Sequence, residues 1–275
     1  MVLNGLHTTT YGENGSRVLF LHGLFGQGRN WTQIAKALAG ESGSKHRVTL
    51  VDLPDHGRSA WLEEFDLVAV ADRVAGLLNA DDPVALVGHS LGGKVAMVLA
   101  LRHPELVERL CVVDIAPVDY AELSEFSGYI EAMRSLDLDV LTQRADAEDA
   151  LTQEVPNKVV RSFLLQNLRR ETGEDGRSRW RWQPNLEGLR RSLPQIKSWP
   201  SEDLGPARYD GPVLWIGGET SSYITDEYAP AMDALFPRNR RVTIKGAGHW
   251  VHSEKPEVFL EVLERFLVRG GSGTG

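Results

Sequence analysis

The chain has 275 residues, 42% of them hydrophobic and 25% charged, which is the composition of an ordinary folded protein. That length suits one large α/β domain with an insertion better than two independent domains. The formal net charge of −8 argues against nucleic acid and anionic membranes as partners, because an acidic surface repels both.

At the start of the chain, residues 1–10 lack the basic segment and apolar core of a signal peptide. No apolar run approaches the ~20 residues that a membrane-spanning helix needs. We therefore expect a soluble protein of the cytoplasm. The single cysteine, Cys111, excludes an internal disulfide, and its apolar neighbours indicate a buried, unreactive thiol.

Short apolar runs alternate with longer amphipathic stretches along most of the chain. Runs that are apolar on both faces are typical of strands buried between two layers of helices. Such strands are predicted at residues 18–21, 48–51, 84–87, 110–113, 213–216 and 242–244, with an edge strand within 3–11. Helices are predicted at residues 31–39, 67–78, 91–102, 227–235 and 256–268. This alternation predicts an α/β fold with a mostly parallel sheet flanked by helices.

The alternation stops between residues 117 and 206, where the patterns predict helices only. These helices are expected at residues 123–136, 147–154, 158–168 and 186–196, and a turn-rich stretch at 172–178 divides them. Because strand candidates lie on both sides, we expect a helical cap over the carboxyl ends of the strands, inserted after the sixth strand. The predicted division is a core of residues 1–116 and 207–269, a cap of residues 117–206 and a flexible tail of residues 270–275.

The pentapeptide at residues 88–92 reads Gly-His-Ser-Leu-Gly and lies between a predicted strand and a predicted helix. This is the G-x-S-x-G pattern of a nucleophile elbow in the context that the elbow requires. The tight turn strains the backbone of Ser90, and the flanking glycines leave room for it. The helix that follows points its free N–H groups at developing negative charge. Ser90 is therefore the predicted nucleophile.

A second loop, His-Gly-Leu-Phe-Gly at residues 22–26, follows another predicted strand. We expect the backbone N–H groups of Leu24 and Leu91 to form an oxyanion hole, with Phe25 as the alternative donor. His22 precedes the nucleophile in the chain, so we expect it to hold this loop by hydrogen bonds rather than to act as a base.

The predicted base is His249, which lies between glycine and tryptophan just after the last predicted strand. Among the other histidines, His56 is expected in a structural turn, and His89 is expected to point away from the nucleophile. His252 is interpreted as a neighbour of the base. No spacing of histidines and cysteine resembles a metal site, so no metal is predicted.

Two residues could supply the acid that orients the base, because the chain order Ser, acid, His admits both. Asp114 ends the strand at 110–113, and Glu219 follows the strand at 213–216. Asp114 has apolar neighbours, so leaving it without a partner would cost several kcal/mol. Glu219 lies among small polar residues that indicate an exposed turn. The chemistry favours Asp114 and leaves Glu219 open.

Four segments, at residues 22–26, 88–94, 113–120 and 246–252, resemble those of the YbfF-type esterases, small bacterial α/β-hydrolases with a helical cap. The resemblance implies the α/β-hydrolase fold and activity on short-chain acyl esters and thioesters. This group carries the acid in an Asp-Ile-Ala-Pro-x-x-Tyr segment, which begins here at Asp114, so the resemblance implies Asp114 as the acid. The loop at 217–224 departs from the group's pattern by one extra residue and by Glu219.

These features predict a serine hydrolase, a carboxylesterase that acts through Ser90, His249 and Asp114 and an acyl-enzyme. The expected partner is a small-molecule acyl ester or thioester, with no cofactor, no nucleic acid and no membrane. The same residues would also serve a cofactor-free perhydrolase or haloperoxidase, or a hydrolase of activated carbon–carbon bonds. A non-catalytic receptor on this fold is disfavoured, because a receptor has no need of all three residues.

Overall fold

The computed structural model contains an eight-stranded sheet with the strand order β1-β2-β4-β3-β5-β6-β9-β10. It describes residues 1–40, 45–120, 124–173 and 176–268, and the predicted tail at 270–275 lies outside them. The strands are β1 (Val2–Leu3), β2 (Leu6–Tyr11), β3 (Ser16–Leu21), β4 (His46–Val51), β5 (Val84–His89), β6 (Val107–Val113), β9 (Val213–Gly218) and β10 (Asn239–Ile244). The pairs from β4 to β10 are parallel, and β1 and β2 add an antiparallel edge. The predicted mostly parallel sheet is confirmed.

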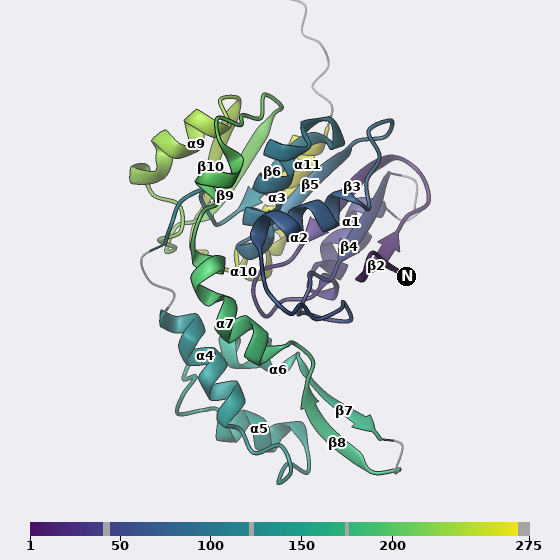
Figure 1. Cartoon of the computed structure of the whole chain (residues 1–275), viewed down its shortest axis with the longest axis vertical. Helices are drawn as coiled ribbons and strands as arrows, with labels where there is room; N and C mark the ends of the chain where they lie inside the picture. Colours follow the sequence, from purple (N-terminus) through teal and green to yellow (C-terminus); the bar gives the residue numbers. More distant parts are fainter. Residues whose placement is uncertain (41–44, 121–123, 174–175, 269–275) are drawn as a thin grey trace, which may run out of the picture.

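Helices cover both faces of this sheet (Figure 1). Along β3, Val18 and Phe20 join one apolar cluster, whereas Leu19 and Leu21 join another, as expected of a strand buried on both faces. The first cluster includes side chains of α1 (Thr32–Ala39) and α11 (Pro256–Leu267). The second includes side chains of α2 (Leu67–Ala75), α3 (Leu91–Arg102) and α9 (Ala229–Leu235). Short helical segments complete this part: η1 (Gly28–Trp31), η2 (Pro104–Leu106), η3 (Asp226–Tyr228) and α10 (Val251–Glu254).

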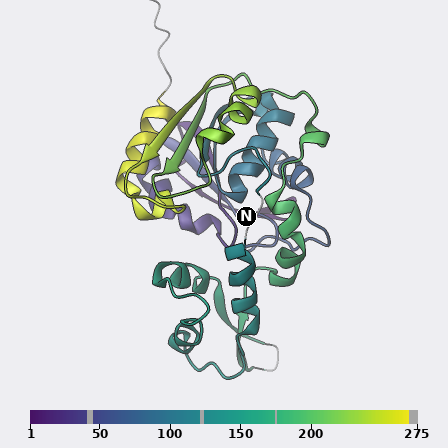
Figure 2. The same cartoon turned by 90° about the vertical axis from the view of Figure 1, so that its left-hand side faces the viewer.

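Between β6 and β9 the chain leaves the sheet, and we call residues 117–206 the insertion. In two perpendicular views its helices and hairpin, coloured teal to green, extend from one end of the sheet-bearing part (Figures 1 and 2). Its elements are α4 (Ser124–Ser135), α5 (Arg144–Ala150), α6 (Lys158–Leu165), β7 (Leu168–Thr172), β8 (Ser178–Trp182), α7 (Leu186–Lys197) and α8 (Ser201–Leu204). The start of the helix predicted at 123–136 falls within residues 121–123, which lie outside the described ranges.

The prediction of helices alone in the insertion is wrong, because β7 and β8 pair as an antiparallel hairpin. The segment Ser-Arg-Trp-Arg-Trp of β8 alternates between arginine and tryptophan, a period of two that is typical of a strand. Trp182 is buried opposite Leu168, and its indole N–H donates to the Met133 carbonyl at 2.8 Å. The arginines on either side of each tryptophan obscure this pattern.

Within the described ranges, no helix is long and apolar enough to cross a membrane.

A comparison of two glycines tests the close packing around the turn after β5. In Gly88→Ala the new Cβ would lie 2.2 Å from the Gly92 carbonyl oxygen, so we expect a loss of about 2 kcal/mol or more of unfolding free energy. Gly128 in α4 has no atom within 4 Å of its would-be Cβ, so Gly128→Ala is expected to add about 1 kcal/mol. Urea unfolding of both variants measures this difference. Equal stability of the two variants would contradict the steric explanation.

Candidate active site

Ser90 lies at the sharp turn between β5 and α3. Its φ of 52° and ψ of −118° place it in a strained region of backbone conformation. Its N–H donates to the Val113 carbonyl at 3.0 Å, which ties the turn to the neighbouring strand β6. A Cβ on Gly92 would meet the Leu21 and His22 carbonyls at 2.5 Å, so only glycine allows α3 to begin so close to β3. The turn holds the Ser90 hydroxyl at the carboxyl end of the sheet.

Asp114 follows β6, is fully buried, and contacts the imidazole of His249. Its Oδ2 lies 2.8 Å from Nδ1 of His249, and because a carboxylate only accepts, Nδ1–H is the donor. The Gly218 N–H donates to Oδ1 at 3.0 Å, and the Ser221 hydroxyl donates to Oδ2. These three hydrogen bonds offset the cost of burying the carboxylate. They also leave Nε2 of His249 as the nitrogen free to accept a proton.

Glu219, the alternative acid, contacts a backbone N–H group rather than the imidazole of His249. Its side chain is exposed, and Oε2 accepts a hydrogen bond of 2.9 Å from the Gly246 N–H. The glutamate therefore steadies the start of the loop that carries His249, and the structure brings Asp114 rather than Glu219 to the imidazole. Ser221, two residues further on, was not predicted as part of the site.

Ser90 and His249 border the same small region. The rings of Tyr223 and Phe126 lie 4.3 and 6.2 Å from that of His249, centroid to centroid. Both also line the cavity beside Ser90. Among the described residues, no hydrogen bond joins the Ser90 hydroxyl to His249. Such bonds are often long in resting enzymes and shorten when the reacting complex forms.

The backbone N–H groups proposed for the oxyanion hole lie at the same cavity, which Leu24 and Leu91 both line. Neither N–H donates to another group within the described part of the chain. The N–H of Phe25, the alternative donor, is engaged by Nε2 of His56 at 3.1 Å. This contact favours Leu24 over Phe25.

His22 and His56 hold the loop that carries Leu24. Nδ1–H of His22 donates to the Gly23 carbonyl at 2.8 Å, and Nε2 accepts from the Leu53 N–H at 2.9 Å. Burial, with the nearby His56, lowers the pKa of His22 to about 3. Burial also lowers the pKa of His56. Both rings are therefore neutral near pH 7, and each can donate from one nitrogen and accept at the other.

Two further histidines, His89 and His252, lie close to His249. His89 donates from Nε2 to the His249 carbonyl at 2.9 Å, and burial holds the pKa of His89 well below its usual value. His252 stacks on Trp31 with the ring centroids 4.0 Å apart, and burial lowers its pKa to about 3. Neither ring takes up a second proton at neutral pH, so neither competes with His249 as the base.

The cavity beside Ser90 has a volume of about 20 Å³. The insertion supplies part of its wall through Tyr120, Phe126 and Ile196, opposite Leu24 and Leu91 of the sheet-bearing part. Its lining is largely apolar, and its volume is about that of one water molecule. Among the described residues, no group of three or more histidine, cysteine or acidic side chains could hold a metal ion.

Lys94, four residues after Ser90, joins α3 to the insertion by hydrogen bonds. Its ammonium donates to the Ile196, Lys197 and Ser198 carbonyls at 3.2, 2.7 and 2.8 Å, at the end of α7. Burial lowers the pKa of Lys94 to about 7. Positive charge at a helix carboxyl end is stabilised by the helix dipole. The role was not predicted, although a lone lysine in an otherwise apolar helix was a signal for it.

Tyr120 fastens the other end of the insertion. Its hydroxyl accepts from the Ala116 N–H at 2.8 Å and donates to the Tyr223 carbonyl at 2.7 Å. The ammonium of Lys94 lies 5.1 Å from the centre of its ring. Lys94 and Tyr120 both line the cavity beside Ser90, so these two contacts of the insertion lie next to the nucleophile.

Comparison with known proteins identifies the family of the chain. The family described as the alpha/beta hydrolase fold matches residues 16–256. The chain is 38% identical over 257 residues to the "sn-1-specific diacylglycerol lipase ABHD11" of Danio rerio, which covers 91% of this chain and 78% of that protein. It is 33% identical over 259 residues to "Esterase YbfF" of Escherichia coli (strain K12), which covers 93% and 94%. The predicted resemblance to the YbfF-type esterases is confirmed.

A solved structure described as "Marine microorganism esterase" superposes with a TM-score of 0.86 at 33% identity. The match covers 95% of this chain and 99% of that chain. The similarity therefore includes the insertion as well as the sheet.

Substitution of the two acidic candidates distinguishes them. Asp114→Asn is expected to cut turnover of p-nitrophenyl acetate by about 10³- to 10⁴-fold, because asparagine cannot stabilise the imidazolium and favours the wrong tautomer. Glu219→Gln is expected to cost at most about tenfold, since the glutamate contacts only the Gly246 N–H. Thermal unfolding of both variants controls for folding. A crippled Glu219→Gln enzyme beside a nearly normal Asp114→Asn enzyme would assign the acid to Glu219.

Proposed function

The chain belongs to the alpha/beta hydrolase fold family, and we propose that within it the chain is a serine carboxylesterase for short-chain acyl esters or thioesters. The observation that carries the proposal is the buried Asp114–His249 hydrogen bond beside a serine held in a strained turn. Its relatives are named as esterases and a diacylglycerol lipase, which supports an ester as the substrate class. The partner is a small molecule.

In the proposed first step, Nε2 of His249 takes the proton of the Ser90 hydroxyl as the oxygen attacks the substrate carbonyl carbon. The carbonyl double bond opens, and its electron pair moves to the oxygen. The N–H groups of Leu24 and Leu91 hold this oxyanion, an effect worth about 3 kcal/mol per donor. The imidazolium then gives its proton to the leaving alcohol or thiol, which departs and leaves an acyl group on Ser90.

The second step releases the acid. Water gives a proton to Nε2 of His249 and attacks the acyl carbon, and the bond to the Ser90 oxygen breaks as that oxygen recovers the proton. Asp114 remains a carboxylate throughout: it fixes the ring with Nδ1–H toward itself and stabilises the charge when Nε2 is protonated. All of these steps use groups of the chain, the substrate and water.

We further propose that residues 117–206 act as a cap that limits the acyl group. Phe126 and Ile196 of the insertion line the cavity beside Ser90, whose volume is about 20 Å³. Ligand pockets for larger molecules usually measure about 300–1,000 Å³. An acyl group beyond a few carbons would therefore have to displace these side chains, so short acyl groups are favoured.

Removal of the nucleophile tests the serine mechanism. Ser90→Ala is expected to lower the rate of p-nitrophenyl acetate hydrolysis by several orders of magnitude, because the remaining groups cannot form the acyl-enzyme. Thermal unfolding should show a folded protein, since alanine removes one hydroxyl and little packing. Near-normal turnover by the purified, folded variant would refute Ser90 as the nucleophile.

Truncation of one cap side chain tests the limit on chain length. Phe126→Ala is expected to raise the kcat/KM for p-nitrophenyl octanoate relative to acetate by about tenfold, or about 1.4 kcal/mol, since it opens the cavity beside Ser90. Val140→Ala is the matched control, because Val140 is 68% exposed in the insertion and does not line the cavity. An unchanged preference in Phe126→Ala would show that the acyl group lies elsewhere.

A further inference from the structure

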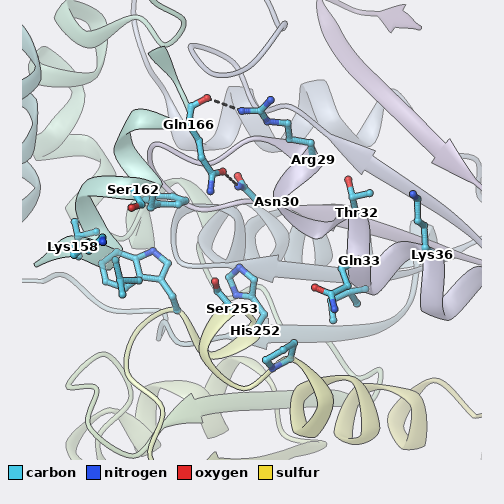
Figure 3. A pocket seen from close by; sticks show the side chains of 16 residues that line it. Arg29, Asn30, Thr32, Gln33, Lys36, Lys158, Ser162, Gln166, His252 and Ser253 are labelled. Carbon is cyan, nitrogen blue, oxygen red and sulfur yellow. Dashed lines mark hydrogen bonds between the residues drawn. The ribbon is translucent and has the colours of Figure 1, made fainter. Parts of the chain in front are cut away.

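A second pocket, of about 940 Å³, lies between the sheet-bearing part and the insertion. Its walls come from η1 and α1 on one side, from α6 on another, and from the segment around α10 (Figure 3). Ser90, Asp114 and His249 do not line it. Trp250 does, so the pocket borders the loop that carries His249 without including the reacting atoms. This volume is typical of sites for small molecules.

The charged side chains that line this pocket are Arg29, Lys36 and Lys158, and all are positive. Figure 3 shows Arg29 and Lys36 toward one side of the pocket and Lys158 on the other. No aspartate or glutamate lies among the described lining residues, and none of the three cations forms an ion pair within the described part of the chain. The chain as a whole has a net charge of −8, so this local excess of positive charge stands apart from the rest of the molecule. We call the site the cationic pocket.

More arginines gather behind Arg29 at the carboxyl end of α6. Arg29 and Arg169 both donate to the Gln166 carbonyl, each at 2.6 Å, so two guanidinium groups share one oxygen. Arg144 donates to the Leu168 carbonyl at 2.8 Å. Burial and the charges of the neighbouring arginines lower the pKa of Arg169 to about 10. Like charges held together in this way create a positive potential that favours a bound anion.

Asp52 attracts Arg29 but makes its close contacts with other groups. Its Oδ1 accepts from the Gly28 N–H at 2.6 Å, and its Oδ2 accepts from the Arg58 N–H at 2.8 Å. The same Oδ2 also lies 3.2 Å from Nδ1 of His7, and within the described part of the chain no ion pair joins this carboxylate to Arg29. The guanidinium groups are left with neutral carbonyl oxygens as their partners.

The other wall of the cationic pocket is apolar. The rings of Phe163 and Trp250 contact each other with their centroids 5.9 Å apart, and both are half-buried. His252, which also lines the pocket, is neutral, since burial lowers its pKa to about 3. The pocket thus offers positive charge on some walls and an aromatic surface on another. An anionic group attached to an apolar body is complementary to both.

We propose that the cationic pocket binds a soluble amphiphilic anion, a small organic phosphate. The positive side chains of Arg29, Lys36 and Lys158 attract its phosphate, and its apolar part packs on Phe163 and Trp250. A bilayer surface fits less well, because the site is concave and the remaining surface of this acidic chain repels anionic lipid. The proposal goes beyond ester hydrolysis, since the site requires neither Ser90 nor His249.

Calorimetric titration of the full chain with 1-naphthyl phosphate tests the proposal, with 1-naphthol as the uncharged control. We expect the phosphate to bind at least about tenfold more tightly than the naphthol. The Lys36→Gln/Lys158→Gln double variant should weaken binding of the phosphate by about tenfold, and so should Arg29→Gln. Raising the salt concentration should weaken it as well, because exposed charges are screened.

The matched control is Arg240→Gln/Lys245→Gln, which removes the same charge from exposed positions on and just after β10, away from the cationic pocket. It should leave binding of the phosphate within about twofold. Equal affinity for naphthol, or equal weakening by the control, would overturn the proposal. So would an absence of binding to 1-naphthyl phosphate together with binding to phosphatidylglycerol vesicles that the Lys36→Gln/Lys158→Gln variant loses. Hydrolysis of p-nitrophenyl acetate by these variants reports on the proposed esterase separately, since none of the substituted residues contacts Ser90 or His249.

Discussion

The buried carboxylate of Asp114 joins the ends of three neighbouring strands, and the geometry of the site depends on it. Asp114 itself ends β6, Gly218 and Ser221 come from the end of β9, and His249 comes from the loop after β10. An unpaired buried carboxylate would cost several kcal/mol, and the three donors offset that cost. Losing any of the three hydrogen bonds would restore part of the cost, so the buried charge keeps the donors in place. The main-chain N–H of Asp114 also bonds to the Ile216 carbonyl at 2.9 Å, so the sheet holds the backbone of the residue that contacts the imidazole.

Two of the contacts that hold the insertion to the sheet-bearing part lie beside Ser90. Lys94 binds the end of α7, and Tyr120 binds the segments after β6 and β9, both within the surroundings of Ser90. Lys94 belongs to the same helix whose first N–H group is proposed to hold the oxyanion. In the proposed reaction, α3 therefore follows directly on the strained Ser90, supplies one oxyanion donor through Leu91, and binds the insertion through Lys94. The hairpin β7–β8, further from Ser90, packs on the insertion itself through Trp182.

Much of the sheet could be predicted because its strands are apolar on both faces, and helix α3 was predicted to the residue. Local patterns also led to Ser90, Asp114 and His249, since each follows a strand end in the main sheet. The hairpin could not be predicted as readily, because the arginines of β7 and β8 obscure the alternating positions of the two tryptophans. Ser221 and Lys94 could not be assigned from spacing, because their partners lie 107 and about a hundred residues away in sequence. Hydrogen bonds between residues so far apart leave no repeating pattern in the sequence.

The most direct test of the central claim is the site and rate of covalent labelling by a fluorophosphonate, read by mass spectrometry of the digested protein. If Asp114 and His249 activate Ser90, one adduct forms, on the peptide that contains Ser90. Its rate of formation should fall by at least about a hundredfold in His249→Gln, because no base then removes the hydroxyl proton. An adduct on another residue, or labelling of Ser90 at an unchanged rate without the imidazole, would contradict the account.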